Sequence, residues 1–154
     1  METNTRRSDY KKFTIVCHDA GATNLILHYI ERFNKTDLNV YMEGPAKNIW
    51  ANTYPKTKFV TSYQNAIKKS NGLISGTGWS SNLEHNARKF ALNNKKYSIA
   101  ILDHWVNYEE RFFRKNQTIL PDEIWVFDKY AFDKAKNIFP KTLIKLKTNL
   151  YLRN

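Results

Sequence analysis

Two acid–histidine pairs stand directly after apolar segments that are typical of buried strands. His18 and Asp19 end one segment, and Asp103 and His104 end another. A carboxylate beside an imidazole can supply an oriented general base, because the carboxylate fixes the tautomer and supports the positive charge that develops on the ring. Ligands of open α/β sheets bind outside the carboxyl ends of the strands, so we expect both pairs at one catalytic site.

Each of these four residues can be the base. Neighbouring residues of an extended segment point apart, so Asp103 need not contact His104, and His18 or Asp19 can be its partner. The same residue types suit zinc or manganese, but neither an HExxH motif nor a pair of cysteines accompanies them. We therefore expect no metal and no cofactor, with a small metal-assisted hydrolase as an alternative.

Small and hydroxyl-bearing residues follow two of the expected strands. Gly21 lets the backbone approach a ligand closely after the first acid–histidine pair. A second group follows another apolar segment and consists of Gly76, Thr77, Gly78, Trp79, Ser80 and Ser81. Its glycines, its hydroxyls and the free N–H groups of the next helix suit a phosphate, a carboxylate or a sugar, and its indole can stack on a ring. The alternative is a tight turn with a buried tryptophan.

The segment after His104 carries further groups that can contact a substrate: Trp105, Asn107, Tyr108 and Arg111. The guanidinium suits a phosphate or a carboxylate. Residues 105–120 are expected to be irregular, and an irregular stretch of that length is usually functional or mobile. The alternative is that the acid–histidine pair caps a loop and that the aromatic side chains pack.

Short apolar segments alternate with longer helical ones, which predicts an α/β fold: a single Rossmann-like three-layer domain with a mainly parallel sheet. The expected strands are residues 13–17, 39–43, 58–60, 72–75, 98–102, 123–127 and 143–146. The expected helices are residues 24–34, 45–52, 63–70, 80–94 and 128–139. Thr23 or Asn24 can cap the first helix, and Ser81 with Glu84 forms a capping box for the fourth.

Length and composition favour one soluble domain. The chain has 154 residues, and we expect a flexible basic arm at residues 1–12 and one domain at residues 13–154. The chain is 42% hydrophobic, but no apolar run approaches the roughly 20 residues that span a bilayer. The first residues lack the apolar core of a signal peptide, so the expected location is cytoplasmic. The lone Cys17 lies in an apolar segment and is expected to be a packed thiol.

The net charge of the chain is +11. A strongly basic chain is typical of nucleic-acid-binding proteins, because Lys and Arg neutralise phosphates. The basic residues of the last part of the chain are, however, spaced along an expected helix and strand rather than gathered in one run. Solvated faces explain this spacing, so we do not expect nucleic acid as a partner. Anionic ligands such as nucleotide sugars, or an acidic neighbouring domain, are the remaining explanations.

Four strings of this sequence resemble a bacterial group of glycosyltransferase-like proteins. They are residues 18–22, 76–84, 102–112 and 120–126. The group is similar to the N-terminal half of the GT-B architecture, which it shares with UDP-N-acetylglucosamine 2-epimerases. The resemblance covers residues 13–152.

GT-B proteins have two Rossmann-like domains that face each other across a cleft. The resemblance implies that the first domain holds the acceptor and often the catalytic base, while the second binds most of the nucleotide-sugar donor. It thus implies an acceptor-side domain of a glycosyltransferase or sugar epimerase in polysaccharide biosynthesis, with Arg111 and residues 76–81 on anionic groups. The base would come from His18, Asp19, Asp103 and His104.

The sequence departs from the similar proteins near its end. Residues 148–154 stand where the related architecture crosses into its second domain, and position 150 is Leu where similar proteins often have Pro. We therefore expect a truncated enzyme that is inactive alone and is completed by a second domain or a partner chain. The other alternative is a non-catalytic module that binds a sugar or nucleotide through the same strand ends.

Overall fold

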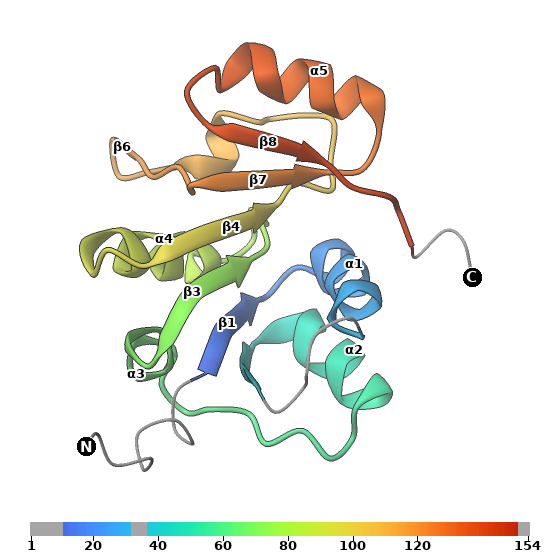
Figure 1. Cartoon of the computed structure of the whole chain (residues 1–154), viewed down its shortest axis with the longest axis vertical. Coiled ribbons are helices and arrows are strands. Elements are labelled where there is room, and N and C mark those ends of the chain that lie inside the picture. The colour runs from blue at the N-terminus through green and yellow to red at the C-terminus, as the bar shows by residue number, and fades with distance from the viewer. Residues whose placement is uncertain (1–10, 32–36, 151–154) are drawn as a thin grey trace, which may run out of the picture.

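The computed structural model describes residues 11–31 and 37–150 (Figure 1). The arm expected at residues 1–12 lies outside this part of the chain, except that Lys11 and Lys12 already belong to the first strand. The strands of the main sheet are β1 (Lys11–Cys17), β2 (Leu38–Met42), β3 (Ser70–Ser75), β4 (Tyr97–Ile101), β7 (Glu123–Val126) and β8 (Leu143–Leu146). The helices are α1 (Ala20–Ile30), α2 (Gly44–Thr53), α3 (Tyr63–Lys68), α4 (Leu83–Asn93) and α5 (Lys129–Ile138).

The main sheet has six strands in the order β2-β1-β3-β4-β7-β8. All five neighbouring pairs are parallel, so every described strand of this sheet ends at the same edge. In the register of these strands, Ile15 of β1 pairs with Val40 of β2 on one side and with Ile74 of β3 on the other. The predicted α/β fold, a Rossmann-like three-layer domain with a mainly parallel sheet, is confirmed.

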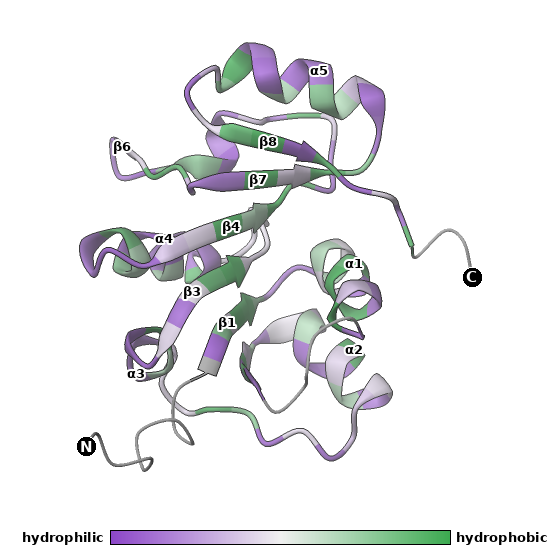
Figure 2. Cartoon of the chain, viewed as in Figure 1, coloured by the Kyte–Doolittle hydropathy of each residue, from purple (hydrophilic) through white to green (hydrophobic). Residues whose placement is uncertain are grey.

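Alternate residues of the strands pack on opposite faces of the sheet, as the two-residue period of a strand requires. Ile15 and Cys17 belong to a core cluster with α1 and α2, whereas Val16 belongs to a cluster with α3 and α4. The α5 side of the sheet has a third cluster, which includes Ala100 and Ile124. Burial on both faces explains why the parts of β1 and β3 nearest their carboxyl ends are hydrophobic (Figure 2).

The first helix begins earlier than the sequence pattern indicates. The backbone N–H of Ala22 donates to Asp19 Oδ2 at 3.1 Å, so Asp19 is the N-cap of α1. The prediction that Thr23 or Asn24 caps this helix is therefore wrong. Thr23 is fully buried and its hydroxyl donates to the carbonyl of Asp19 at 2.7 Å.

The capping box predicted for the fourth helix is also wrong. The N-cap of α4 is Asn82, whose side chain makes no capping hydrogen bond. Ser81 Oγ accepts from the backbone N–H of Leu83 at 3.1 Å. Glu84 points instead into the protein, where it is 1% exposed.

Two connections differ from the expected ones. Residues 58–60 do not form a strand, although the backbone N–H of Val60 donates to the carbonyl of Val40 at 3.0 Å. Residues 105–120 are less irregular than expected, because they contain a 3₁₀ helix at Glu110–Phe112 and a small antiparallel hairpin. The hairpin strands are β5 (Phe113–Arg114) and β6 (Gln117–Thr118). Its turn residues, Lys115 and Asn116, both have positive φ, as a two-residue hairpin turn requires.

None of the described helices combines the length and the apolar character needed to span a membrane.

The central strand β3 provides a test of how much stability the core supplies. Leu73 is fully buried in this strand, so Leu73→Ala should lower the free energy of unfolding by roughly 2–5 kcal/mol. Urea denaturation followed by circular dichroism measures this change. The matched control is Leu92→Ala on α4, where the side chain is 55% exposed and the expected change is within about 0.5 kcal/mol. Equal losses in the two variants would contradict the packing described above.

Candidate functional site

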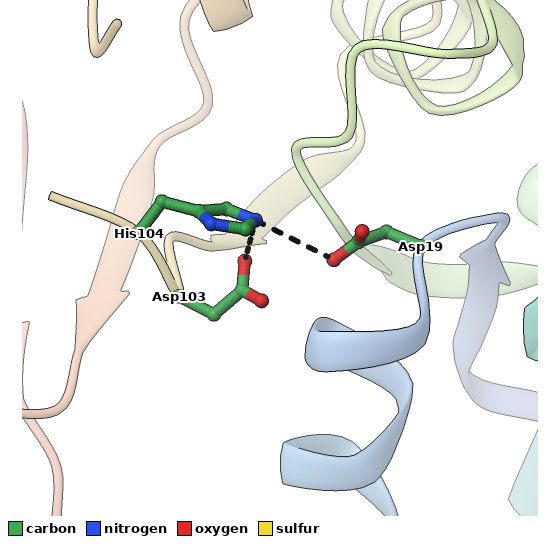
Figure 3. Close-up of side chains that lie close together, drawn as sticks. All are labelled: Asp19, Asp103 and His104. Carbon is green, nitrogen blue, oxygen red and sulfur yellow. Dashed lines mark ion pairs between the residues drawn. The ribbon is translucent and has the colours of Figure 1, made fainter. Parts of the chain in front are cut away.

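Three of the four predicted catalytic residues meet at the carboxyl edge of the sheet. The ligand atoms of Asp19, Asp103 and His104 all lie within 4.8 Å of one another (Figure 3). Asp19 connects β1 to α1, and the other two follow β4. Only β3 lies between β1 and β4, and all three strands are parallel. The segments that follow β1 and β4 therefore lie close together at the carboxyl edge of the sheet.

The imidazole of His104 points one ring nitrogen towards both carboxylates (Figure 3). Its Nε2 is 3.2 Å from Asp103 Oδ1 and 4.0 Å from Asp19 Oδ2. The shorter contact does not have hydrogen-bond geometry, since Asp103 Oδ1 has no hydrogen-bond partner within the described part of the chain. The side chain of Asp103 is 8% exposed, whereas that of His104 is 39% exposed. A buried carboxylate oxygen without a hydrogen bond therefore lies next to an accessible imidazole.

Gly21 makes the approach of Asp103 possible. A Cβ atom at position 21 would lie 1.9 Å from Asp103 Oδ2, far inside van der Waals contact. The carboxylate thus lies against the first turn of α1, where the helix carries partial positive charge. The sequence predicts that Gly21 lets a ligand approach the backbone. In the structure, the side chain that approaches the backbone there is Asp103, one of the candidate bases.

Burial and the neighbouring carboxylate change the acidity of Asp103. Burial, and then the charge of Asp19, raise the pKa of Asp103 from its ordinary value of 3.8 to about 7, against the opposing effect of Arg111. Burial, and then the charge of Arg111, lower the pKa of His104, with Asp19 opposing. Near neutral pH, Asp103 therefore exchanges its proton readily while the imidazole is mostly uncharged.

His18 lies at the neighbouring strand end and outside the cluster of three. A Cβ atom on Gly44 would be 2.5 Å from His18 Nε2, so the imidazole packs against the start of α2. Gly44 has a φ of +56°, a left-handed conformation that glycine adopts without strain. The mirror-ordered pairs of the sequence are thus only partly united, because Asp19 joins the second pair and His18 does not.

Glu84 holds together the two turns beside the site. Its carboxylate accepts the backbone N–H of Gly78 at 2.9 Å and that of His18 at 3.4 Å. A Cβ atom at Gly76 would lie 2.0 Å from Glu84 Oε2. Burial raises the pKa of Glu84, while the nearby charge of Arg88 opposes this change. The glycines after β3 therefore make room for a carboxylate of the protein.

Arg88 also holds the turn after β3 in place through hydrogen bonds. It is 1% exposed and donates to the carbonyl of Gly76 at 2.6 Å and to Ser75 Oγ at 3.2 Å. It also donates to the carbonyl of Arg111 at 3.3 Å. Burial lowers the pKa of Arg88 to about 10.

Neither Glu84 nor Arg88 was singled out from the sequence as a functional residue. The available signal was their four-residue spacing, which places both side chains on the same helix face. They alternate along α4 with the buried Leu83, Ala87 and Ala91. A charged pair at the margin of an apolar stripe indicates a buried network.

Most of the residues predicted to bind substrate after β3 have structural contacts instead. Thr77 is fully buried, and its hydroxyl donates to the carbonyl of Ile101 at 2.8 Å. Ser81 serves the start of α4, as described above. Trp79 is 49% exposed and Ser80 is also exposed, so these two side chains remain accessible to a ligand. The alternative prediction of a buried tryptophan in this turn is wrong.

The segment after His104 divides in the same way. Tyr108 is buried and donates to the carbonyl of His104 at 2.6 Å. Arg111 is 5% exposed and donates to the carbonyls of Val106 and Thr77, each at 3.0 Å. These two side chains hold the backbone of the loops, whereas Trp105 and Asn107 are exposed.

A cavity of about 340 Å³ adjoins Asp103 and His104. Its lining comes from α1, from the segments that follow β4, β7 and β8, and from α5. The lining residues are Leu25, Leu102, Asp103, His104, Trp105, Phe127, Asp128, Ala131 and Asn149. The acid–base groups of the site thus border a space that can hold a small molecule.

The cluster of Asp19, Asp103 and His104 could supply three ligands to a divalent metal, and one nitrogen with carboxylate oxygens suits zinc or manganese. Two features oppose a cation. Asp19 Oδ2 already accepts the N–H of Ala22 at the positive end of α1. The charge of Arg111 also acts on Asp103 and His104. A proton on Asp103 relieves the repulsion between the two carboxyl groups without a cation.

Comparison of the chain with protein-family models, with curated proteins and with solved structures gives no match.

The raised pKa of Asp103 predicts a pH dependence of stability. The folded carboxyl titrates at about 7 and the unfolded one at 3.8, so the folded state binds more protons between these values. The free energy of unfolding should therefore fall as the pH rises through this range, by at most about 4 kcal/mol from this group. Asp103→Asn should remove this part of the slope and be the more stable protein above about pH 7.

Urea denaturation of both proteins at several pH values measures the difference in slope. Asp133→Asn is the control, because this exposed carboxylate lies on α5. Parallel pH profiles for wild type and Asp103→Asn would contradict the assignment.

The N–H of Ala22 on Asp19 and the charge of Arg111 near Asp103 and His104 also predict weak metal binding. We expect EDTA to leave the melting temperature unchanged and elemental analysis to find less than one equivalent of metal in the purified protein. Stoichiometric zinc or manganese that is lost in Asp19→Asn would instead establish the metal-assisted hydrolase.

Proposed function

We propose that this chain is the acceptor-side domain of a GT-B-like glycosyltransferase or sugar epimerase, with Asp103 as the general base. The observation that carries the proposal is the position of Asp103 at the carboxyl edge of the sheet. Its carboxylate is buried, it borders a cavity of small-molecule size, and Oδ1 has no hydrogen-bond partner among the described residues. The resemblance of residues 18–22, 76–84, 102–112 and 120–126 to glycosyltransferase-like proteins supports it.

In glycosyl transfer, the acceptor hydroxyl donates a hydrogen bond to the carboxylate of Asp103, which lines the cavity. As the hydroxyl oxygen forms its bond to the anomeric carbon of a nucleotide sugar, the bond from that carbon to the nucleoside diphosphate breaks and the hydroxyl proton passes to Asp103. A base that titrates near the working pH suits this step. Asp19 contributes by raising the pKa of Asp103, and His104 lines the accessible side of the site.

The donor would be held by a second domain or a partner chain. Within the described residues, the cations beside the site have hydrogen bonds to backbone carbonyls: Arg111 to Val106 and Thr77, and Arg88 to Gly76. They support the loops of the acceptor side, and phosphate groups of the donor need other partners.

A non-catalytic sugar-binding module is the second candidate. It is favoured by the structural use of Thr77, Tyr108 and Arg111, which leaves Trp79 and Trp105 as exposed aromatic platforms. Exposed aromatic rings bind the apolar faces of sugars whether or not a reaction follows.

The acceptor-side assignment predicts binding with little turnover. The full chain should be stabilised by one or more sugars in a thermal-shift screen of monosaccharides, nucleotide sugars and nucleotides. Mass spectrometry of the same mixtures should find at most residual glycosyl transfer, which Asp103→Asn lowers about 100-fold or more while Asp133→Asn does not. Rapid transfer by the chain alone would contradict the need for a donor-binding partner. Stabilisation by no sugar would overturn the proposed function, and residual transfer that survives Asp103→Asn would remove Asp103 as the base.

A further inference from the structure

The cavity beside Asp103 and His104 has a chemical character that points to a class of ligand. Its volume of about 340 Å³ lies at the lower end of the range for small-molecule sites, roughly 300–1,000 Å³. This space suits one sugar ring better than a whole nucleotide sugar. Leu25, Leu102, Phe127 and Ala131 make much of its wall apolar.

Trp105 forms a fixed aromatic rim of this cavity. Its side chain is 58% exposed, yet its Nε1 donates to Asp128 Oδ2 at 2.7 Å. Lys134 donates to the carbonyl of the same residue. An exposed indole that is held at both the ring and the backbone is prepared to stack on the C–H face of a pyranose at low entropic cost.

The charged groups of the lining are mainly hydrogen-bond acceptors. The cavity has two carboxylates, Asp103 and Asp128, and one imidazole, His104. The oxygens of Asp128 accept from Trp105 Nε1 and from the backbone N–H of Ala131, whereas Asp103 Oδ1 has no hydrogen-bond partner in the described structure. A sugar hydroxyl can donate to the carboxylate of Asp103, whereas a phosphate or carboxylate would be repelled by Asp128 and by the ionised form of Asp103.

The nearby cations do not reverse this preference. Arg111 is buried and donates to the carbonyls of Val106 and Thr77. Lys134 donates to the carbonyl of Trp105 and lies 4.8 Å from the ring centroid of Tyr108. Neither residue belongs to the cavity lining.

We propose that this cavity is a subsite for a neutral pyranose, which stacks on Trp105 and donates a hydroxyl hydrogen bond to Asp103, and that it rejects sugars carrying phosphate or carboxylate groups. This inference rests on the proposed function and deepens it by naming the class of the acceptor. It differs from the sequence prediction, which expected Arg111 and residues 76–81 to contact anionic groups.

Saturation-transfer NMR with the full chain tests the subsite. The probes are neutral methyl pyranosides, including 2-acetamido sugars, each paired with its 6-phosphate or with the corresponding uronic acid. At least one neutral probe should bind, and its charged counterpart should bind at least tenfold more weakly. Tighter binding of the charged member in every pair that binds would overturn the proposal.

The variants Trp105→Ala and Trp105→Phe locate the binding. The alanine variant should weaken the neutral probe at least tenfold, and the phenylalanine variant should recover much of the loss because it restores a stacking ring. Tyr130→Ala is the matched control, since this aromatic residue on α5 is 64% exposed and does not line the cavity. Circular dichroism checks that each variant is folded.

The outcomes separate the two proposals. If neutral sugars bind but Trp105→Ala has no effect, the subsite is wrong while the proposed function stands with a ligand elsewhere on the strand ends. If no sugar binds to the wild-type chain, both the subsite and the proposed function are overturned.

Discussion

The arrangement of this protein around its site depends on one buried carboxylate. Glu84 accepts hydrogen bonds from the backbone of His18 and Gly78, and so joins the end of β1 to the turn after β3. An unpaired carboxylate at this depth would be costly, and these bonds offset part of that cost. Arg88, one helical turn further along α4, completes the network through the carbonyls of Gly76 and Arg111. The loops that carry the site are thus held by a buried polar network of Glu84 and Arg88.

A second constraint is the proximity of two carboxyl groups. Asp19 is committed to the N-cap of α1, and Asp103 is pressed against the same turn because Gly21 lacks a side chain. Burial, and then the like charge of Asp19, raise the pKa of Asp103. The residue that caps α1 therefore also makes the neighbouring Asp103 a weaker acid. Capping and acid–base chemistry are coupled through the first turn of one helix.

Sequence patterns predicted the architecture well because burial on both sheet faces leaves continuous apolar runs, such as the one around Ile15. They predicted three members of the acid–base cluster because ligands of α/β sheets gather at strand ends. They failed where a polar side chain has several competing partners. Glu84 matched a capping box, yet the backbone of His18 and Gly78 offered it buried donors from distant segments. The short strand expected at residues 58–60 failed because Val60 makes one backbone bond to Val40 without extending the sheet.

The sequence by itself determined the order along the chain of the helices and the main-sheet strands. It also determined which strand ends carry polar groups, including the two acid–histidine pairs. These features follow from local periodicity and composition. Tertiary structure alone decided which members of the pairs meet. It turned His18 towards α2 and joined Asp19 to Asp103 and His104, because side-chain directions at the sheet edge depend on close contacts such as those at Gly21 and Gly44. It also separated Arg111 and Tyr108, which hold the loops, from Trp105, which borders the cavity. Hydrogen bonds to distant carbonyls leave no local pattern in a sequence.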